Sequence, residues 1–151
     1  MEYTIGQVSE KTGLPVSTLR YYDNQGLFPH MERSAGIRKF TNRELETIRM
    51  IECLKKTGME IRNIRQFMQW CAQGSATYAQ RKALLEQQQA EAEAELARMR
   101  QVLDMLTYKC WYYDQAIQDG NEDRVKNLTP ESMPEEIRRA YQNGHAEEPK
   151  K

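Results

Sequence analysis

The strongest constraint on the fold is the spacing of helix signals close to the N-terminus. A capping box at residues 4–7, with Thr as the cap and Gln three residues later, begins a first helix that ends at Gly13. Pro15 is tolerated only at the start of the next helix, which we expect from Val16 to Gln25. Two short helices joined by a tight, glycine-containing turn predict a helix-turn-helix, whose second helix enters the DNA major groove.

Residues 29–40 predict a β-hairpin wing directly after this unit. Ser34-Ala35-Gly36 supplies the turn, and Phe40 gives an apolar anchor. Cations stand on both arms, and taken alone they fit a solvated basic hairpin equally well. Beside a helix-turn-helix they suit contacts to DNA phosphates, which position a protein without reading sequence. These wing cations are Arg33, Arg38 and Lys39.

A pair of amphipathic helices is expected after the wing. A second capping box at residues 41–44 begins a helix that runs to Thr57, and the next helix ends near Gly74. Apolar residues recur at helical spacing on both, which is typical of a packed core and gives no catalytic pattern. They are Leu45, Ile48, Ile51 and Leu54 on the first helix and Ile61, Ile64, Phe67 and Met68 on the second.

A long helix is predicted next, because no Pro or Gly occurs between Thr77 and Gly120 and strong helix formers dominate. Its apolar residues follow a heptad repeat, which predicts a coiled-coil seam. Too little chain remains outside the N-terminal core to cover this stripe, so we expect an antiparallel homodimeric coiled coil, with intramolecular packing as the alternative. The predicted seam consists of Leu96, Met99, Leu103, Leu106, Cys110, Tyr113 and Ile117.

The expected architecture is therefore mainly α. Residues 1–74 form a winged helix-turn-helix DNA-binding domain, and residues 75–119 form the dimerisation helix. Residues 120–151 form a polar tail with a possible short helix from Ser132 to Tyr141, and Gly144–Lys151 is expected to be a disordered end.

Charge and composition narrow the function. The chain has 151 residues with 22 basic and 22 acidic side chains, but basic residues exceed acidic ones by three within residues 1–70, which permits a local basic face. No apolar run approaches the ~18 residues of a membrane-spanning helix, so we expect a cytoplasmic protein that has no contact with the membrane. No phosphate loop, metal cluster or Ser/His/Asp set is apparent, so neither an enzyme nor a cofactor is expected.

Two sequence motifs resemble the MerR family of bacterial transcription regulators. One is Leu19-Arg20-Tyr21-Tyr22-Asp23 followed by Gly26-Leu27, and the other is Gly36-Ile37-Arg38-Lys39-Phe40. The resemblance covers about residues 2–118, and it departs from the family at Ile37, where an aromatic residue is common. It implies DNA contacts from Ser17, Thr18, Arg20, Tyr21 and Tyr22 on the second helix and from Arg38 and Lys39 in the wing. It also implies a homodimer on a palindromic promoter that bends and untwists the DNA so that RNA polymerase can use an overlong spacer.

The stretches from Glu52 to Met59 and from Lys109 to Tyr113 resemble the AdhR/NmlR-like branch, which implies a response to aldehydes or other electrophiles through Cys53. Arg49 and Lys56 lie one helical turn away, and nearby cations favour the reactive thiolate. An inert core cysteine is the alternative, since free cysteines are often buried.

Two other functions remain open. One is a metal or small-ligand sensor without thiol chemistry. The resemblance to metal-sensing MerR relatives makes Cys71 and Cys110 the candidate metal ligands, but neither has paired Cys or His ligands nearby in the sequence. With Cys53 they make three cysteines without a CxxC pattern, which predicts free thiols. A coiled-coil protein adaptor is the remote alternative, and salt-dependent retention on DNA would separate it from a regulator.

Overall fold

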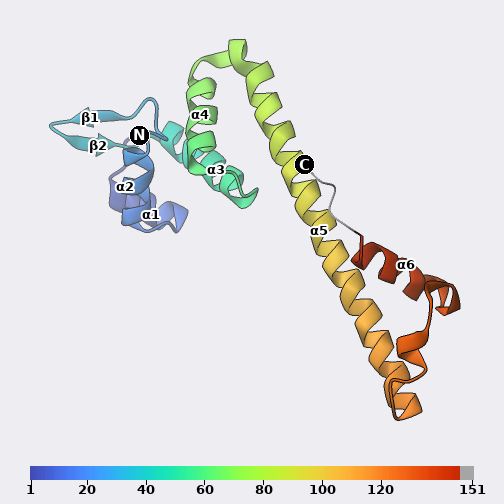
Figure 1. Cartoon of the computed structure of the whole chain (residues 1–151). Helices are drawn as coiled ribbons and strands as arrows, with labels where there is room; N and C mark the ends of the chain where they lie inside the picture. Colours follow the sequence, from blue (N-terminus) through green and yellow to red (C-terminus); the bar gives the residue numbers. More distant parts are fainter. Residues whose placement is uncertain (147–151) are drawn as a thin grey trace. The chain divides into compact units, whose positions relative to one another are not determined.

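The computed structural model describes residues 1–146 and is mainly helical, with one two-stranded sheet. It contains two compact units. The first comprises Met1–Ala90, and the second begins at Glu91. The predicted mainly α architecture with an N-terminal helix-turn-helix, a small wing and a long helix is confirmed (Figure 1).

The first unit begins with the helix-turn-helix. Helix α1 (Ile5–Thr12) starts at the Thr4–Gln7 capping box and stops at Gly13, whose φ of 73° is the left-handed conformation that favours glycine. Helix α2 (Val16–Asn24) follows Pro15, and its buried residues Leu19 and Tyr22 face the core. The two helices are adjacent at the blue end of the chain in Figure 1.

The wing is an antiparallel pair, β1 (Glu32–Ser34) and β2 (Ile37–Lys39), in which Arg33 lies opposite Arg38. Ala35 and Gly36 form the turn with positive φ angles of 48° and 79°, as two-residue hairpins require. An isolated bridge between Tyr3 and Phe40 brings the N-terminal segment alongside the base of the wing, with a Tyr3 N to Phe40 O distance of 2.7 Å.

Helices α3 (Asn42–Lys56) and α4 (Ile61–Ala72) complete the first unit. The second capping box starts α3 as predicted, and the apolar faces of both helices join a core shared with α1, α2 and the wing. Phe28 and Phe40 pack edge to face there at 5.9 Å between ring centroids. The buried core comprises Val8, Leu19, Tyr22, Leu27, Phe28, Phe40, Ile48, Ile51, Leu54, Met59, Ile64, Phe67 and Met68.

Helix α5 (Tyr78–Asp119) follows a short 3₁₀ turn, η1 (Gly74–Thr77), and supplies residues to both units. The first unit extends into α5 and ends at Ala90. The domain boundary expected at residue 74 therefore lies within the first unit. Leu84 packs against the core of this unit, and the side-chain amide of Gln88 donates to the carbonyl of Thr57 at 2.9 Å.

The second unit contains the rest of α5, the 3₁₀ turns η2 (Val125–Asn127) and η3 (Pro130–Ser132), and helix α6 (Glu135–Gly144). The expected short helix exists but extends past Tyr141 to Gly144. The disordered end expected from Gly144 is wrong for residues 144–146. Gly144 is buried and ends α6, the His145 ring packs against Tyr108 and Tyr141, and the Ala146 carbonyl accepts from the Gln101 amide at 2.6 Å. Residues 147–151 of that expectation lie outside the described part of the chain. A β-carbon on Gly144 would come within 2.9 Å of the Met105 backbone, so glycine permits this close helix contact.

Candidate nucleic-acid interface and thiol cleft

Helix α2 presents a polar face to solvent. Ser17 and Arg20 are exposed, Thr18 is half-buried, and the Tyr21 ring is 47% exposed. These residues lie near the beginning and middle of α2, the part of a recognition helix that reaches base edges. The structure therefore leaves Ser17, Thr18, Arg20 and Tyr21 available for DNA.

Tyr22 is a correction to the predicted DNA-contacting set. Its side chain is only 1% exposed and lies in the core, because adjacent residues on a helix point in different directions. Its hydroxyl donates to Glu52 Oε1 at 2.5 Å and accepts from Lys55 Nζ at 2.7 Å. Tyr22 thus joins α2 to α3. Burial and the hydrogen bond to Glu52 raise the pKa of Tyr22, and the bond to Tyr22 raises the pKa of Lys55.

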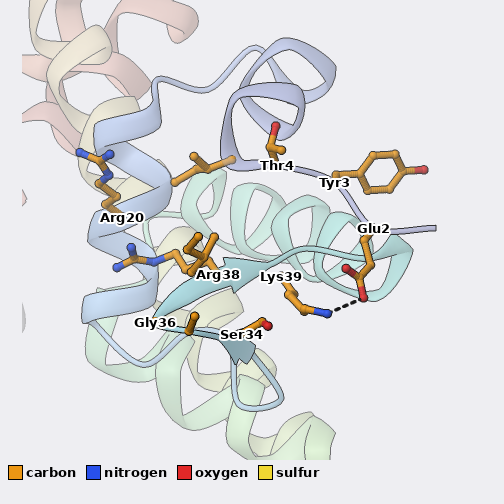
Figure 2. A pocket seen from close by; sticks show the side chains of 11 residues that line it. Glu2, Tyr3, Thr4, Arg20, Ser34, Gly36, Arg38 and Lys39 are labelled. Carbon is orange, nitrogen blue, oxygen red and sulfur yellow. Dashed lines mark hydrogen bonds and ion pairs between the residues drawn. The ribbon is translucent and has the colours of Figure 1, made fainter.

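A groove of about 710 Å³ lies between the wing and the N-terminal segment (Figure 2). Arg20 and Arg38 extend toward the same side of α2 in this view, while Lys39 points toward Glu2 and forms an ion pair of 3.0 Å with it. Ile37 is 72% exposed on the wing. The groove is lined by Glu2, Tyr3, Thr4, Ile5, Arg20, Ser34, Ala35, Gly36, Ile37, Arg38 and Lys39.

One carboxylate connects both arms of the wing to α2. Asp23 Oδ2 accepts from Arg33 Nη2 at 2.5 Å and from Arg38 Nε at 2.6 Å. The Asp23 side chain is 7% exposed, against 47% for Arg33 and 22% for Arg38. Because opposite charges stabilise a partly buried carboxylate, this arrangement fixes the wing relative to the recognition helix.

Cys53 is exposed, so the alternative of a buried core cysteine is wrong. It lines a second cleft of about 720 Å³ between α1 and α3. Three cations share this cleft with the thiol, namely Lys11, Arg49 and Lys56, and the Lys11 ammonium lies 5.1 Å from the centre of the Tyr3 ring. Glu52 also lines the cleft, so the residue that holds the Tyr22 hydroxyl adjoins the thiol. A carbonyl compound in the cleft would have direct access to this sulfur.

The other two cysteines have different surroundings. Cys71 is half-buried, and its sulfur accepts from Arg81 Nη1 at 3.7 Å. Cys110 is exposed on α5. Among residues 1–146, no group of three or more His, Cys, Asp or Glu side chains has the arrangement of a metal site.

The predicted seam residues of α5 are exposed in the single chain, with exposed fractions from 52% for Leu106 to 77% for Ile117 among its large apolar members. Helix α6 contacts a different row of α5. Asn143 Nδ2 donates to Asp104 Oδ2 at 2.5 Å, and the Tyr108 and Tyr141 rings lie 4.8 Å apart. By helical periodicity this row is opposite the seam. The intramolecular alternative for the seam is therefore not realised within the described second unit.

Several residues of these sites were not anticipated from the sequence. The sequence motif that contains Asp23 does not predict its ion pairs with the wing, and no sequence pattern links Glu52 and Lys55 to Tyr22. The spacing of Glu52 and Lys55 on α3 places both side chains on one face, and this was the available signal. Nothing in the sequence pattern indicated that Lys11 of α1 would share a cleft with Cys53.

The sequence matches two family descriptions, "MerR HTH family regulatory protein" over residues 3–70 and "MerR, DNA binding" over residues 45–108. An uncharacterized HTH-type transcriptional regulator of Haemophilus influenzae is 35% identical over 136 residues, which cover 89% of this chain and 98% of the relative. The HTH-type transcriptional regulator AdhR of Bacillus subtilis is 33% identical over 82 residues, covering 54% of this chain and 59% of AdhR.

A crystal structure of HiNmlR, a MerR family regulator lacking the sensor domain, bound to promoter DNA, is similar with a TM-score of 0.59 and 35% sequence identity. The match covers 85% of this chain and 100% of that chain. These similarities agree with the expected AdhR/NmlR-like branch. None of the helices within residues 1–146 is both long enough and apolar enough to cross a bilayer.

Proposed function

This chain belongs to the MerR family of DNA-binding transcriptional regulators, and we propose that it activates a stress-responsive promoter in response to aldehydes or related electrophiles. In this proposal a homodimer binds the promoter, bends and untwists the spacer, and so allows RNA polymerase to engage both promoter elements. Cys53 is the sensing thiol.

The main support for a DNA-binding face is the groove between the wing and the N-terminal segment, which Arg20 of α2 also lines. Arg20 and Arg38 extend in one direction from two different elements, and Lys39 lines the same groove. Cations held on a rigid surface suit the phosphate backbone, while the exposed part of α2 is free to reach base edges. The similar regulator HiNmlR was crystallised bound to promoter DNA, which supports promoter binding by this chain.

Replacing Arg38 by Ala tests this face. The variant should bind promoter DNA more weakly at every sequence, and the slope of log affinity against log salt should fall by about one phosphate contact. Fluorescence anisotropy over a range of salt concentrations measures both quantities. Arg139→Ala removes an equally charged, exposed side chain from α6 and is the matched control, which should keep the wild-type slope. An unchanged slope in Arg38→Ala would reject the phosphate contact.

The second cleft supports thiol sensing. Lys11, Arg49 and Lys56 place positive charge around an accessible sulfur, and positive charge favours the nucleophilic thiolate. Attack of that sulfur on an aldehyde carbon forms a C–S bond, and the carbonyl oxygen takes up a proton to give a hemithioacetal without any oxidant. Added bulk at Cys53 adjoins Glu52, whose contact with Tyr22 leads to α2. A local adduct can thereby bias a two-state DNA geometry.

We expect Cys53→Ser to bind the promoter with wild-type affinity but to lose induction by aldehyde. The measurement is a reporter driven by the target promoter, in cells with and without a sublethal dose of formaldehyde. Cys71→Ser and Cys110→Ser remove the other thiols in the same way and should retain induction. Full induction in Cys53→Ser would exclude thiol sensing and favour the alternative of a metal or a non-covalent ligand.

Assembly as a homodimer is the remaining part of the proposal. The stripe that includes Leu103 and Leu106 is apolar, regular and exposed along α5. A heptad stripe of this kind is stabilised by pairing with a second helix, and a second copy of the chain carries the complementary stripe. Two copies would present two recognition helices to the two half-sites of a palindrome.

A further inference from the structure

Asp23 occupies the point at which the wing meets the recognition helix. Its Oδ2 atom accepts from Arg33 on β1 and from Arg38 on β2, which lie directly opposite each other in the hairpin. The carboxylate is 7% exposed, although both arginines reach the surface of the first unit. A single buried acid therefore determines the direction of two predicted phosphate-binding side chains.

The geometry leaves donors available for DNA. Arg38 uses Nε for Asp23, so neither of its terminal nitrogens is needed for that bond. Arg33 uses one terminal nitrogen, Nη2. A guanidinium carries five N–H donors, so each arginine retains enough donors to bind a phosphate while it remains paired with Asp23.

We propose that Asp23 is a positioning residue for DNA binding, which holds Arg33 and Arg38 in the orientation in which they meet the phosphate backbone. This inference rests on the proposed DNA-binding face. The carboxylate removes rotamer freedom from two long side chains before DNA arrives, and that ordering otherwise opposes binding. Its effect on affinity is thus favourable even though it carries the same charge sign as DNA.

If Asp23 acted only through its charge, its loss would change DNA affinity in the opposite direction. Loss of an acid from a DNA-binding face should strengthen attraction to a polyanion and make the salt dependence steeper. Asp23→Asn removes the charge and the charge-assisted hydrogen bonds while keeping the size of the side chain. The direction of its effect therefore separates positioning from simple repulsion.

The experiment measures affinity for a fluorescein-labelled duplex of the DNA directly upstream of this protein's own coding sequence. We expect Asp23→Asn to bind about five- to tenfold more weakly than wild type, because charge-assisted bonds are roughly twice as strong as neutral ones. The slope of log affinity against log salt should also become shallower. Glu32→Gln removes the same charge from an exposed position on β1 and is the matched control, which should bind at least as tightly as wild type.

A double-mutant cycle shows whether Asp23 acts through the arginines. In the Arg33→Ala/Arg38→Ala background, Asp23→Asn should no longer weaken DNA binding. It should instead tighten binding, because the only remaining effect of Asp23 is repulsion between its carboxylate and the DNA. A loss of affinity that persists in this background would overturn the proposal and indicate a general structural role. Thermal melting of each variant identifies a temperature at which all are folded for the binding measurement.

The outcomes also distinguish this inference from the proposed function. If wild type fails to bind the duplex in a salt-dependent manner, the DNA-binding face itself is wrong. If wild type binds and Arg38→Ala weakens binding, but Asp23→Asn tightens binding as Glu32→Gln does, then only the positioning role of Asp23 is wrong.

Discussion

Tyr22 shows how one side chain can belong to both the core and the functional apparatus. Its ring is buried among apolar residues, and its hydroxyl lies between Glu52 and Lys55 of α3. Burial and Glu52 raise the pKa of Tyr22 and outweigh the opposing effect of Lys55, while the bond to Tyr22 raises the pKa of Lys55, so Tyr22 is neutral beside a charged Lys55. The recognition helix is therefore attached to α3 by a polar contact immediately next to Cys53.

The raised pKa values of Tyr22 and Lys55 predict a loss of stability at alkaline pH. Each group binds its proton more tightly in the folded chain, so its contribution is complete below the ordinary pKa of 10.0 for Tyr22 and 10.5 for Lys55. It is lost as the pH rises through the folded value. Tyr22→Phe should lower the free energy of unfolding by about 1 kcal/mol at pH 8. Between about pH 9 and 11 the variant should lose less stability than wild type, because it lacks the titrating hydroxyl. Urea denaturation at fixed protein concentration measures this, and parallel pH curves for the two proteins would contradict it.

Residue-level predictions from the sequence succeeded where local spacing determines the outcome. Both capping boxes and the glycine end of α1 depend on neighbouring residues, and they occur as expected. The core position of Tyr22 and the exposure of Cys53 depend instead on which face of a helix meets its neighbours. A single sequence does not specify how α1 packs on α3, so Arg49 and Lys56 beside Cys53 followed from helical spacing, whereas Lys11 in the same cleft came only from the structure.

At the scale of elements, α5 has two apolar faces in the second unit, of which one is packed against α6 and the other is exposed. One row, which includes Tyr108, packs against α6. The opposite row, which includes Leu103 and Leu106, remains exposed. The tail thus covers only one side of the helix and leaves the heptad stripe free for a partner.

Substitution of Leu103 and Leu106 by Asp tests the stripe. Two charges buried in a coiled-coil seam without partners should prevent pairing, so the variant should sediment as a monomer and lose affinity for the palindromic promoter. Ala94→Asp introduces a charge on the side of α5 away from the stripe and should remain a dimer. A Leu103→Asp/Leu106→Asp variant that still sediments as a dimer would show that the seam lies elsewhere.

The long helix and the wing were predictable as elements because each has a continuous local signal. In residues 120–146 only a short helix was predictable, and its packing was not, because few apolar residues occur there. Its packing depends on isolated positions, Val125, Met133 and Ala140, and on Gly144 against the Met105 backbone. A glycine in a polar tail normally predicts the end of a helix. Here the absence of a side chain on Gly144 also permits close contact between α6 and α5.

At the scale of the whole molecule, the proposed mechanism requires DNA deformation by a pair of wing-and-helix surfaces. The energy of bending and untwisting depends on the spacer and not only on contacted bases. We expect a target promoter whose spacer is shortened to the length that polymerase ordinarily uses to be active without this protein and insensitive to formaldehyde. In vitro transcription with purified polymerase, with and without the protein, measures this. Continued dependence of the short-spacer promoter on the protein would contradict activation by spacer deformation.

The single carboxylate at Asp23 also has an evolutionary consequence. Loss of Arg33 leaves Arg38 anchored, and the reverse holds as well, but loss of Asp23 leaves both guanidinium groups without a buried counter-charge. Loss of Asp23 therefore has a larger effect than loss of either arginine. The order in which these substitutions accumulate in a lineage consequently matters. Sequences that have lost the acid should also have exchanged at least one arginine, whereas sequences that have lost one arginine can retain the acid.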